Sequence, residues 1–379
     1  MIRIFLFNRV KKLIPKISST ELIALESGTT CIDREIFEGK VNYPEKIKFE
    51  NKFQHDLVSD LLSKYGHLES IYPTTNSYIH YKEVLDYIGK NKFFSFIIPE
   101  EYGGTNLAVN EMANILTTIS SYKPTWGIIT MVPNSLGPGE VWQHYVTEEQ
   151  KKKYLPNLAN GDLIPCFGLT GPNNGSDATG SIDEGIVKKD DNGNIFIDIN
   201  VNKRYITLAP VANLIGLAFN LKDPSNLLQN GKEGITLVLL EREHDGLHLK
   251  THHNPLNTGF PNGTIKGNIQ IPLENIIGGQ CNVGNGWKML MECLAAGRGI
   301  CLPATANASS KVSTLGVLQY AKHRTQFKMP LIKLEAIQDQ IVEMLYHTGI
   351  IQSSVKLTNT LLDSGEKPGA IADIMLTRI

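Results

Sequence analysis

The chain has 379 residues, enough for two or three domains that each bury a core, and we expect about three. Its 37 lysines and arginines nearly balance 38 acidic residues, so the net charge of −1 argues against a nucleic acid partner. The five cysteines are scattered without a C-x-x-C pair, which indicates reduced thiols of a cytosolic protein and neither a zinc site nor a disulfide framework. No apolar run approaches the roughly 20 residues of a membrane-spanning helix.

Residues 1–50 are predicted to form a basic N-terminal arm. Met1 to Ile17 hold five basic residues, no acidic one, and many apolar side chains, as in a basic amphipathic segment. The apolar stretch Ile4–Phe7 is too short for a secretory signal, and no small-residue cleavage site follows it. Three interpretations stay open: an arm packed on the protein body, an interfacial segment on an anionic membrane, and a targeting segment.

Residues 51–165 are predicted to form a helical domain, because apolar residues recur at every third or fourth position over most of this range. A breaker-rich loop is expected at Pro133–Gly139. After it, Thr147 is the expected N-cap of a helix that ends near Asn160–Gly161.

Residues 166–280 are predicted to form a β domain. Four strands are expected, at Ile195–Val201, Leu214–Leu221, Gly234–Leu240 and Thr264–Ile271. The sequence Asp-Asn-Gly-Asn at Asp191–Asn194 predicts a hairpin turn. Because no helical segments separate these strands, an antiparallel sheet or small barrel is favoured. A Rossmann fold is excluded, since no G-x-G-x-x-G follows a strand and opens a helix.

Residues 281–379 are predicted to form a C-terminal helical bundle. Helical spacing returns from Gly284, and a second helix is expected from about Ile332 to Asp363. A third begins near Pro368. Two long helices without further partners leave an apolar face uncovered, so we expect the bundle to be incomplete, with the sequence cut at Ile379.

The stretch Cys166–Gly180 concentrates small and hydroxylated residues at the point where the architecture changes. Its glycines allow the backbone to approach a ligand closely, and Thr170 and Ser176 add hydroxyl groups. A polar connecting loop is the alternative. In the bundle, Arg298 lies between two glycines, each of which lowers helix stability by about 1 kcal/mol relative to alanine. Such a cost indicates that another group approaches the helix closely there, so Arg298 is a candidate ligand contact.

This order of domains, with Thr170–Asp177 at the start of the β domain, resembles the acyl-CoA dehydrogenases over nearly the whole chain from about Ser18. The resemblance implies FAD as cofactor. It assigns the flavin contacts to a loop and to an aromatic-Ile-Thr triplet, namely Phe167, Gly168, Leu169, Thr170, Gly175, Ser176, Tyr205, Ile206 and Thr207.

Several positions depart from the pattern of that family. Gly171 stands where Glu is common, Asn173 and Asn174 replace small residues, and Tyr205 replaces the usual Trp. We expect a site built largely from backbone groups to tolerate these changes.

The same resemblance implies roles for two arginines and one glutamate. Arg324 opens an Arg-x-x-Phe motif whose final Gly is lost, and its implied role is to hold the FAD pyrophosphate across a subunit boundary. Arg298 is implied to contact the CoA ester, as is Ser176. Glu335 replaces a cofactor-contacting Gln, and a carboxylate there would repel the pyrophosphate unless it were protonated or turned away.

The implied reaction needs a carboxylate base for the α-proton of the thioester. The family's usual Glu lies in a Glu-Gly string that residues 1–379 do not reach, and its alternative position on the first bundle helix is Gly297 here. Glu292 lies nearly two turns earlier, with no geometric case that it reaches the same spot. No catalytic residue is therefore assigned, and impaired turnover is expected. No metal ligand is assigned either, because His252 and His253 have no third ligand at metal spacing.

Three longer strings are similar to the large bacterial membrane-associated dehydrogenases of medium- and long-chain fatty-acid β-oxidation, namely Pro133–Glu140, Lys203–Pro210 and Gly297–Pro303. The resemblance implies an acyl-CoA substrate, an electron-transfer flavoprotein as acceptor and a homo-oligomer. It also implies a cytoplasmic location, with peripheral inner-membrane contact through the basic N-terminus. Two alternatives stay open: a non-catalytic flavin- or acyl-CoA-binding remnant or partner chain, and an acyl-CoA oxidase.

Overall fold

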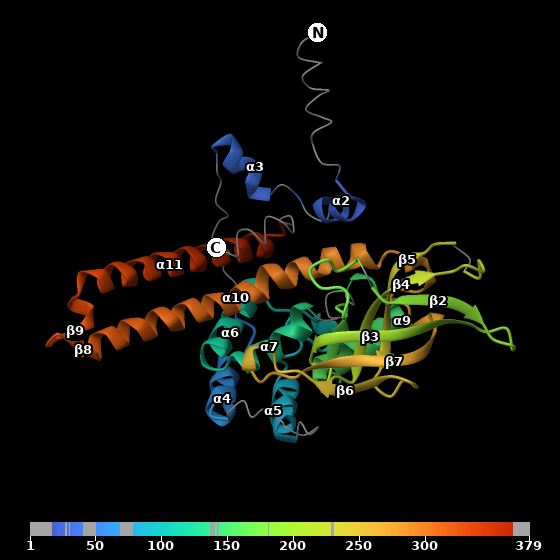
Figure 1. Cartoon of the computed structure of the whole chain (residues 1–379), viewed down its shortest axis with the longest axis horizontal. Coiled ribbons are helices and arrows are strands. Elements are labelled where there is room, and N and C mark those ends of the chain that lie inside the picture. Colours follow the sequence, from blue (N-terminus) through green and yellow to red (C-terminus); the bar gives the residue numbers. More distant parts are fainter. Residues whose placement is uncertain are drawn as a thin grey trace, which may run out of the picture.

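The computed structural model describes residues 17–26, 29, 31–40, 51–68, 79–136, 141, 144–180, 182–228 and 231–366. Two short helices, α2 (Ser19–Glu26) and α3 (Cys31–Glu38), precede a helical domain, a β-sheet domain and a pair of long helices (Figure 1). This order confirms the expected architecture. The basic segment and the third bundle helix lie outside the described residues, apart from Ile17.

The helical domain contains α4 (His55–Tyr65), α5 (Ile79–Lys90), the 3₁₀ turn η1 (Glu100–Tyr102), α6 (Val109–Tyr122), α7 (Pro124–Met131) and α9 (Glu148–Asn160). The predicted cap of α9 is confirmed. The Thr147 hydroxyl accepts a hydrogen bond from the Gln150 N–H at 3.2 Å, and the Gln150 side chain accepts one from the Thr147 N–H at 3.1 Å. The helix ends at Gly161, whose φ of 79° lies in the left-handed region.

The loop expected from Pro133 is wrong in its first part, because Val132–Leu136 forms a π-helical turn, η2, that continues α7. The buried side chain of Asn134 explains the difference. Its amide donates to the carbonyls of Phe93 and Thr130, and its oxygen accepts from the N–H of Phe96. These bonds satisfy backbone groups that a breaker-rich sequence would otherwise leave open. Residues 137–140 lie outside the described part of the chain.

The β domain is a seven-stranded sheet of β1 (Pro165–Gly168), β2 (Glu184–Lys189), β3 (Ile195–Thr207), β4 (Leu214–Lys222), β5 (Gly234–Glu241), β6 (His248–His252) and β7 (Asn262–Pro272). The order is β1-β4-β2-β3-β7-β6, with β5 also on β4. All four expected strands are confirmed. The turn at Asp191–Asn194 is also present, but it joins β3 to β2, a strand that was not among the four expected. The sheet is mixed, however, because β4 runs parallel to both β1 and β2, while the other pairs are antiparallel.

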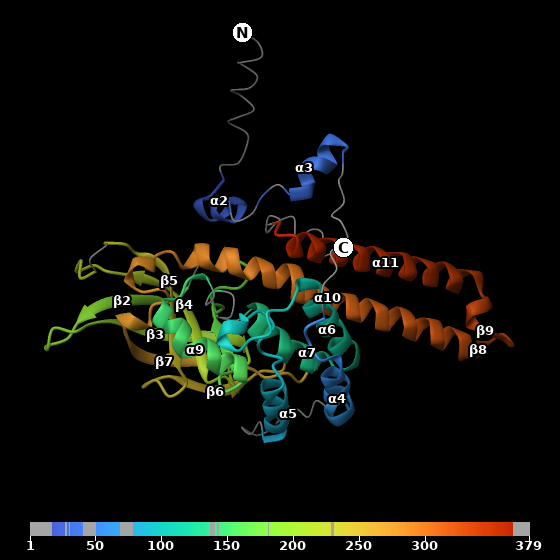
Figure 2. The same ribbon diagram turned by 180° about the vertical axis from the view of Figure 1, so that it is seen from behind.

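The bundle consists of α10 (Gly286–His323) and α11 (Glu335–Asp363), which lie side by side in both views (Figures 1 and 2). A small hairpin, β8 (Thr325–Gln326) and β9 (Met329–Pro330), and a 3₁₀ turn, η6 (Leu331–Lys333), connect the two helices. As expected, the pair exposes large apolar side chains: Val312, Leu315, Val317, Tyr320, Val342, Leu345 and Tyr346.

The far end of α11 is attached to the helical domain. The Asp363 carboxylate accepts hydrogen bonds from the N–H groups of Val109 and Asn110 at 2.6 and 3.0 Å, and so caps the first turn of α6 from a distant part of the chain. No helix among the described residues is both long enough and apolar enough to cross a bilayer.

Candidate functional site

The stretch Cys166–Gly180 begins in strand β1 of the sheet and continues as the loop that leads toward β2. Its first part is tightly packed. A Cβ atom on Gly168 would lie 2.8 Å from a Leu217 methyl group and 3.2 Å from the Lys203 Cγ, so a larger residue would require these side chains to shift. Burial raises the pKa of the Cys166 thiol, which therefore stays protonated. Gly175 and Ser176, by contrast, are exposed on the outer turn.

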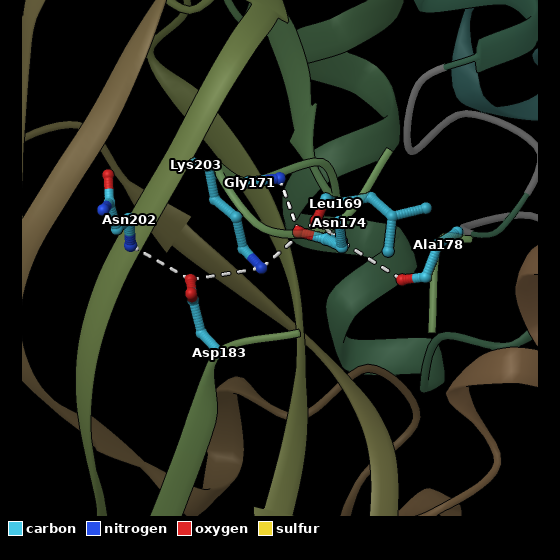
Figure 3. A network of polar contacts seen from close by, with 7 residues as sticks. All are labelled: Leu169, Gly171, Asn174, Ala178, Asp183, Asn202 and Lys203. Carbon is cyan, nitrogen blue, oxygen red and sulfur yellow. Dashed lines mark hydrogen bonds and ion pairs between the residues drawn. The ribbon is translucent and has the colours of Figure 1, made fainter. Parts of the chain in front are cut away.

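The buried side chain of Asn174 holds this loop together (Figure 3). Its oxygen accepts from the Gly171 N–H at 2.7 Å, and its amide donates to the carbonyls of Leu169 and Ala178, both at 3.1 Å. A Cβ on Gly171 would lie only 2.8 Å from that Asn174 oxygen. The two departures from the family pattern, Gly171 and Asn174, thus fit each other.

A buried ion pair lies beneath the same loop. The Lys203 side chain is 1% exposed, and its ammonium lies 3.2 Å from the Asp183 carboxylate and 3.2 Å from the Leu169 carbonyl, to which it donates a hydrogen bond (Figure 3). The Asp183 carboxylate also accepts from the Asn202 N–H at 3.0 Å. Burial lowers the pKa of Lys203, while the charge of Asp183 and its hydrogen bond oppose that effect.

The triplet Tyr205–Thr207 lies at a bulge in β3. The register between β3 and β7 shifts between Lys203 and Ile206, and Tyr205 has a left-handed φ of 62°. The bulge turns the Tyr205 ring outward, where it is 54% exposed, and leaves Ile206 buried. The Arg204 N–H donates to the Thr170 carbonyl at 3.0 Å. The structure therefore brings the loop and the triplet together, as the resemblance implied.

Polar and aromatic groups surround Tyr205. Its ring centroid lies 4.7 Å from that of His253, and the Arg204 guanidinium carbon lies 5.2 Å from the Tyr205 ring. The His253 Nε2 lies 2.7 Å from the Thr264 hydroxyl. Burial, aided by the positive charge of Arg204, lowers the pKa of His253, so this imidazole is neutral at pH 7.

These groups suit a flavin. Among the described residues, the buried Nε of Arg204 and Oδ1 of Asn262 have no hydrogen-bond partner in the chain, and the Thr170 N–H donates to no described group. A flavin ring has donors and acceptors along its edge and a flat face that packs on an aromatic side chain such as Tyr205. Unsatisfied buried polar atoms beside an exposed aromatic ring are therefore compatible with FAD.

Arg324 does not join this site within one chain. It is the exposed residue directly after α10, at the end of that helix opposite the sheet (Figure 1). A helix of 38 residues is roughly 55 Å long at 1.5 Å per residue. Glu335 opens α11 near the same end and is exposed. Arg298 and Gly297 lie in α10, but the side chain of Arg298 is outside what the structure describes.

Glu292, which the sequence offered as a weak candidate base, forms contacts of its own on α10. The Tyr145 hydroxyl donates a hydrogen bond to its carboxylate, and the Lys288 ammonium lies 3.9 Å away. These contacts place the Glu292 carboxylate among polar groups on the surface of α10, and not in the apolar pocket that suits a general base.

Four residues of the site were not found by sequence reasoning: Asn174, Asp183, Lys203 and Asn262. One signal for Lys203 was present. Its side chain lies on the same face of β3 as those of Ile197, Ile199 and Val201. Because that face is buried, the pattern predicts a buried lysine at this position. Asp183 and Asn262 carry no comparable signal, since acids and amides are ordinary in loops and at strand ends. Asn174 was noted only as a departure from the family pattern.

A helical domain, a β domain with a flavin-compatible edge and a pair of long helices define an FAD-dependent dehydrogenase class, and comparison with known proteins agrees. Residues 50–162 match the model of the acyl-CoA dehydrogenase N-terminal domain, and residues 284–377 match that of the C-terminal domain. The chain therefore belongs to the acyl-CoA dehydrogenase family, whose members are FAD-dependent oxidoreductases acting on CH–CH bonds.

Among relatives, an acyl-CoA dehydrogenase of Bacillus subtilis is 30% identical over 69% of this chain and 66% of its own length. A short-chain specific acyl-CoA dehydrogenase of Megasphaera elsdenii is 30% identical over 70% of this chain and 67% of its own. The structure of an acyl-CoA dehydrogenase complexed with FAD from Bacillus anthracis matches with a TM-score of 0.73 and 24% identity, over 88% of this chain and 56% of that one. This structural match shows a shared fold.

Proposed function

We propose that the chain binds FAD between the Leu169–Ser176 loop and the Tyr205–Thr207 triplet. In this proposal, its reaction is the α,β-dehydrogenation of acyl-CoA to trans-2-enoyl-CoA. The observation that carries the proposal is the hydrogen bond from the Arg204 N–H to the Thr170 carbonyl, which joins the two motifs into one edge. Medium or long acyl chains are proposed from the strings Lys203–Pro210 and Gly297–Pro303.

When bound, FAD supplies the acceptor for the β-hydrogen as hydride. The residues of the chain position the reactants. In this proposal the Thr170 N–H and hydroxyl hold the flavin edge, the Tyr205 ring packs on the ring system, and Ser176 and Arg298 meet the CoA ester. Because α10 has glycine at position 297, where some members of the family place the base, this proposal assigns no residue to take the α-proton.

Two partners belong to the same proposal. The first is an electron-transfer flavoprotein, which would approach the exposed face of Tyr205. The second is another copy of this chain. Arg324 lies at the opposite end of α10 from the loop, beside exposed apolar side chains such as Tyr320 and Phe327, so it can reach a pyrophosphate only in a neighbouring subunit.

The test is anaerobic spectroscopy of the purified polypeptide 1–379 with FAD and then octanoyl-CoA or palmitoyl-CoA. We expect flavin absorbance that follows the protein through gel filtration and a spectral shift when acyl-CoA binds. Bleaching should be slow for this polypeptide, because position 297, where some members of the family place the base, is Gly.

Each alternative has its own outcome in that experiment. Acyl-CoA binding without any bleaching, even after prolonged incubation, would favour a non-catalytic binding chain over the dehydrogenase. Peroxide release in air would favour an oxidase. A polypeptide that takes up no FAD at any concentration would contradict the proposal altogether. The variant Thr170→Val removes one hydroxyl at nearly constant volume, and it should weaken FAD binding where Thr179→Val, in the same loop, should not.

A further inference from the structure

The ion pair between Lys203 and Asp183 is more than a structural contact of the sheet. Lys203 is the one charged residue among the largest fully buried side chains of the described residues. Its ammonium touches the carbonyl of Leu169, the residue directly before Thr170. The same carbonyl accepts from the Asn174 amide, so two donors fix the orientation of a single peptide group.

Fixing that carbonyl also fixes the other end of its peptide. In a planar trans peptide the C=O of Leu169 and the N–H of Thr170 point in opposite directions, so a carbonyl held toward Lys203 turns the Thr170 N–H away from it. A cation beside the carbonyl also polarises the amide and makes its N–H a stronger donor. The Thr170 N–H has no partner among the described residues.

We propose that Lys203 and Asp183 are positioning residues of the flavin site, which orient and polarise the Leu169–Thr170 peptide so that the Thr170 N–H is preorganised to donate to the flavin. The proposal rests on the proposed FAD binding. Asp183 keeps the ammonium in place and is itself held by the Asn202 N–H, while the neighbouring Arg204 N–H holds the Thr170 carbonyl. Three consecutive residues of β3 thus fix both sides of the Thr170 backbone.

The free energy of burying charges indicates that Lys203 and Asp183 do more than stabilise the fold. Burying two charges costs more free energy than their attraction commonly returns, and apolar residues of similar volume often stabilise a protein as well or better. A lysine with its ammonium against a loop carbonyl is therefore a costly way to fill this space. It is an effective way to hold a peptide dipole in one direction.

The experiment compares two double variants on the same strands. Lys203→Met with Asp183→Asn removes the buried lysine charge and its partly buried carboxylate partner, and it nearly keeps the side-chain volumes. Lys188→Met with Asp198→Asn does the same to an exposed pair between β2 and β3. For each, the dissociation constant of FAD from the apoprotein and the midpoint potential of the bound flavin are measured, with circular dichroism as the check on folding.

We expect the buried variant to fold, to bind FAD at least tenfold more weakly, and to show a more negative midpoint potential, because a positively polarised donor that stabilises reduced flavin has been removed. The exposed variant should match wild type in all three. A buried variant with wild-type affinity and wild-type potential would overturn the proposal, as would equal losses in both variants. A merely structural role would change stability but leave the potential of the remaining holoprotein unmoved, and it too would overturn the proposal.

A second measurement needs no variant and decides the matter if the buried double variant fails to fold. Hydrogen exchange of wild-type apoprotein should show slow exchange at Gly171, Asn202 and Arg204, since their N–H groups are already engaged without cofactor. Fast exchange there that becomes slow only with FAD would show that the loop is not preorganised. If wild type binds no FAD at all, the proposed function fails, while exchange in the apoprotein still reports whether the loop is preorganised.

Discussion

The two ends of the β2–β3 hairpin carry the same chemistry in different surroundings. At its tip, Lys188 and Asp198 form an exposed ion pair beside a turn that Asp190 closes by accepting the Asn194 N–H at 2.7 Å. At its open end, Lys203 and Asp183 form a buried ion pair against the Leu169 carbonyl. The exposed pair at the tip loses little hydration and adds little to the free energy of unfolding. The buried pair loses hydration, and hydrogen bonds from neighbouring groups must offset that loss.

The comparison also separates what local sequence specifies from what distant contacts specify. The turn at the tip depends on hydrogen bonds between Asp190 and Asn194, which are four positions apart. The open end depends on pairs far apart in sequence, such as Lys203 with Leu169 and Asn262 with Tyr205. Its backbone is also strained, with left-handed φ angles at Tyr205 and Leu208 that need tertiary support. The proposed ligand site thus lies where contacts with distant parts of the chain hold the backbone in a strained conformation.

The largest effect is expected from Asp183→Asn alone. This change leaves the Lys203 ammonium buried without a carboxylate, so we expect the free energy of unfolding to fall by about 3 kcal/mol at pH 7. Loss of the lysine proton limits the penalty, because burial already lowers the Lys203 pKa. Urea denaturation followed by circular dichroism measures the change. The matched variant Asp198→Asn at the tip should stay within about 0.5 kcal/mol of wild type. Similar losses at the two sites would refute the contrast drawn between the two ends.

The sequence predicted the regular parts of the fold well, for physical reasons that the hairpin illustrates. The alternation of Ile197, Ile199 and Val201 and the turn residues after Asp190 are local signals, and they identified β3 and its tip. The loop and the triplet were found by resemblance. Their connection through Arg204 to Thr170, and the support by Lys203 and Asp183, could not be found, because they depend on which strands become neighbours.

The parallel pairing of β4 with β1 and β2 is the feature of the sheet that its strand pattern did not reveal. Periodicity shows which face of a strand is buried but does not specify its neighbour or its direction. The same limit explains Asn134, whose side chain turned an expected loop into a helical turn through contacts with Phe93 and Phe96.

A smaller effect, of about 2 kcal/mol, is expected from Gly171→Glu, which restores the residue common in the family. The new Cβ would lie 2.8 Å from the Asn174 oxygen and 3.0 Å from the Asn202 carbonyl oxygen, so the loop must shift and lose the Asn174 hydrogen bonds. Thermal unfolding and FAD affinity measure the change. Adding Asn174→Ala should restore part of the loss by removing one of the two clashes.

The neighbouring Gly175→Ala serves as its control, since no atom lies within 4 Å of a Cβ at that position. It should change stability by less than about 0.5 kcal/mol. A Gly171→Glu protein as stable as Gly175→Ala, with unchanged FAD binding, would mean that the loop conformation does not depend on Asn174 as the geometry indicates.

The smallest expected effect is a change in the free energy of unfolding at alkaline pH, which arises only from the open end of the hairpin. Burial places the pKa of Lys203 in the folded protein below its value of about 10.4 in an unfolded chain. Between those two values the unfolded chain carries a proton at this lysine that the folded chain has lost. Stability therefore rises with pH through this window, and the difference is constant below the lowered folded-state pKa, where both states are protonated.

The comparison that isolates this lysine is wild type against Lys203→Met with Asp183→Asn, which keeps every other titrating group. Urea denaturation midpoints of both proteins from pH 7 to pH 10 should diverge toward high pH, with wild type gaining stability relative to the variant. A difference that stays flat over this range would mean that the pKa of Lys203 is not lowered in the folded state. A gain toward low pH would mean that Asp183 raises the pKa more than burial lowers it, and in that case the ion pair would stabilise the fold without the cost that sets the open end apart from the tip.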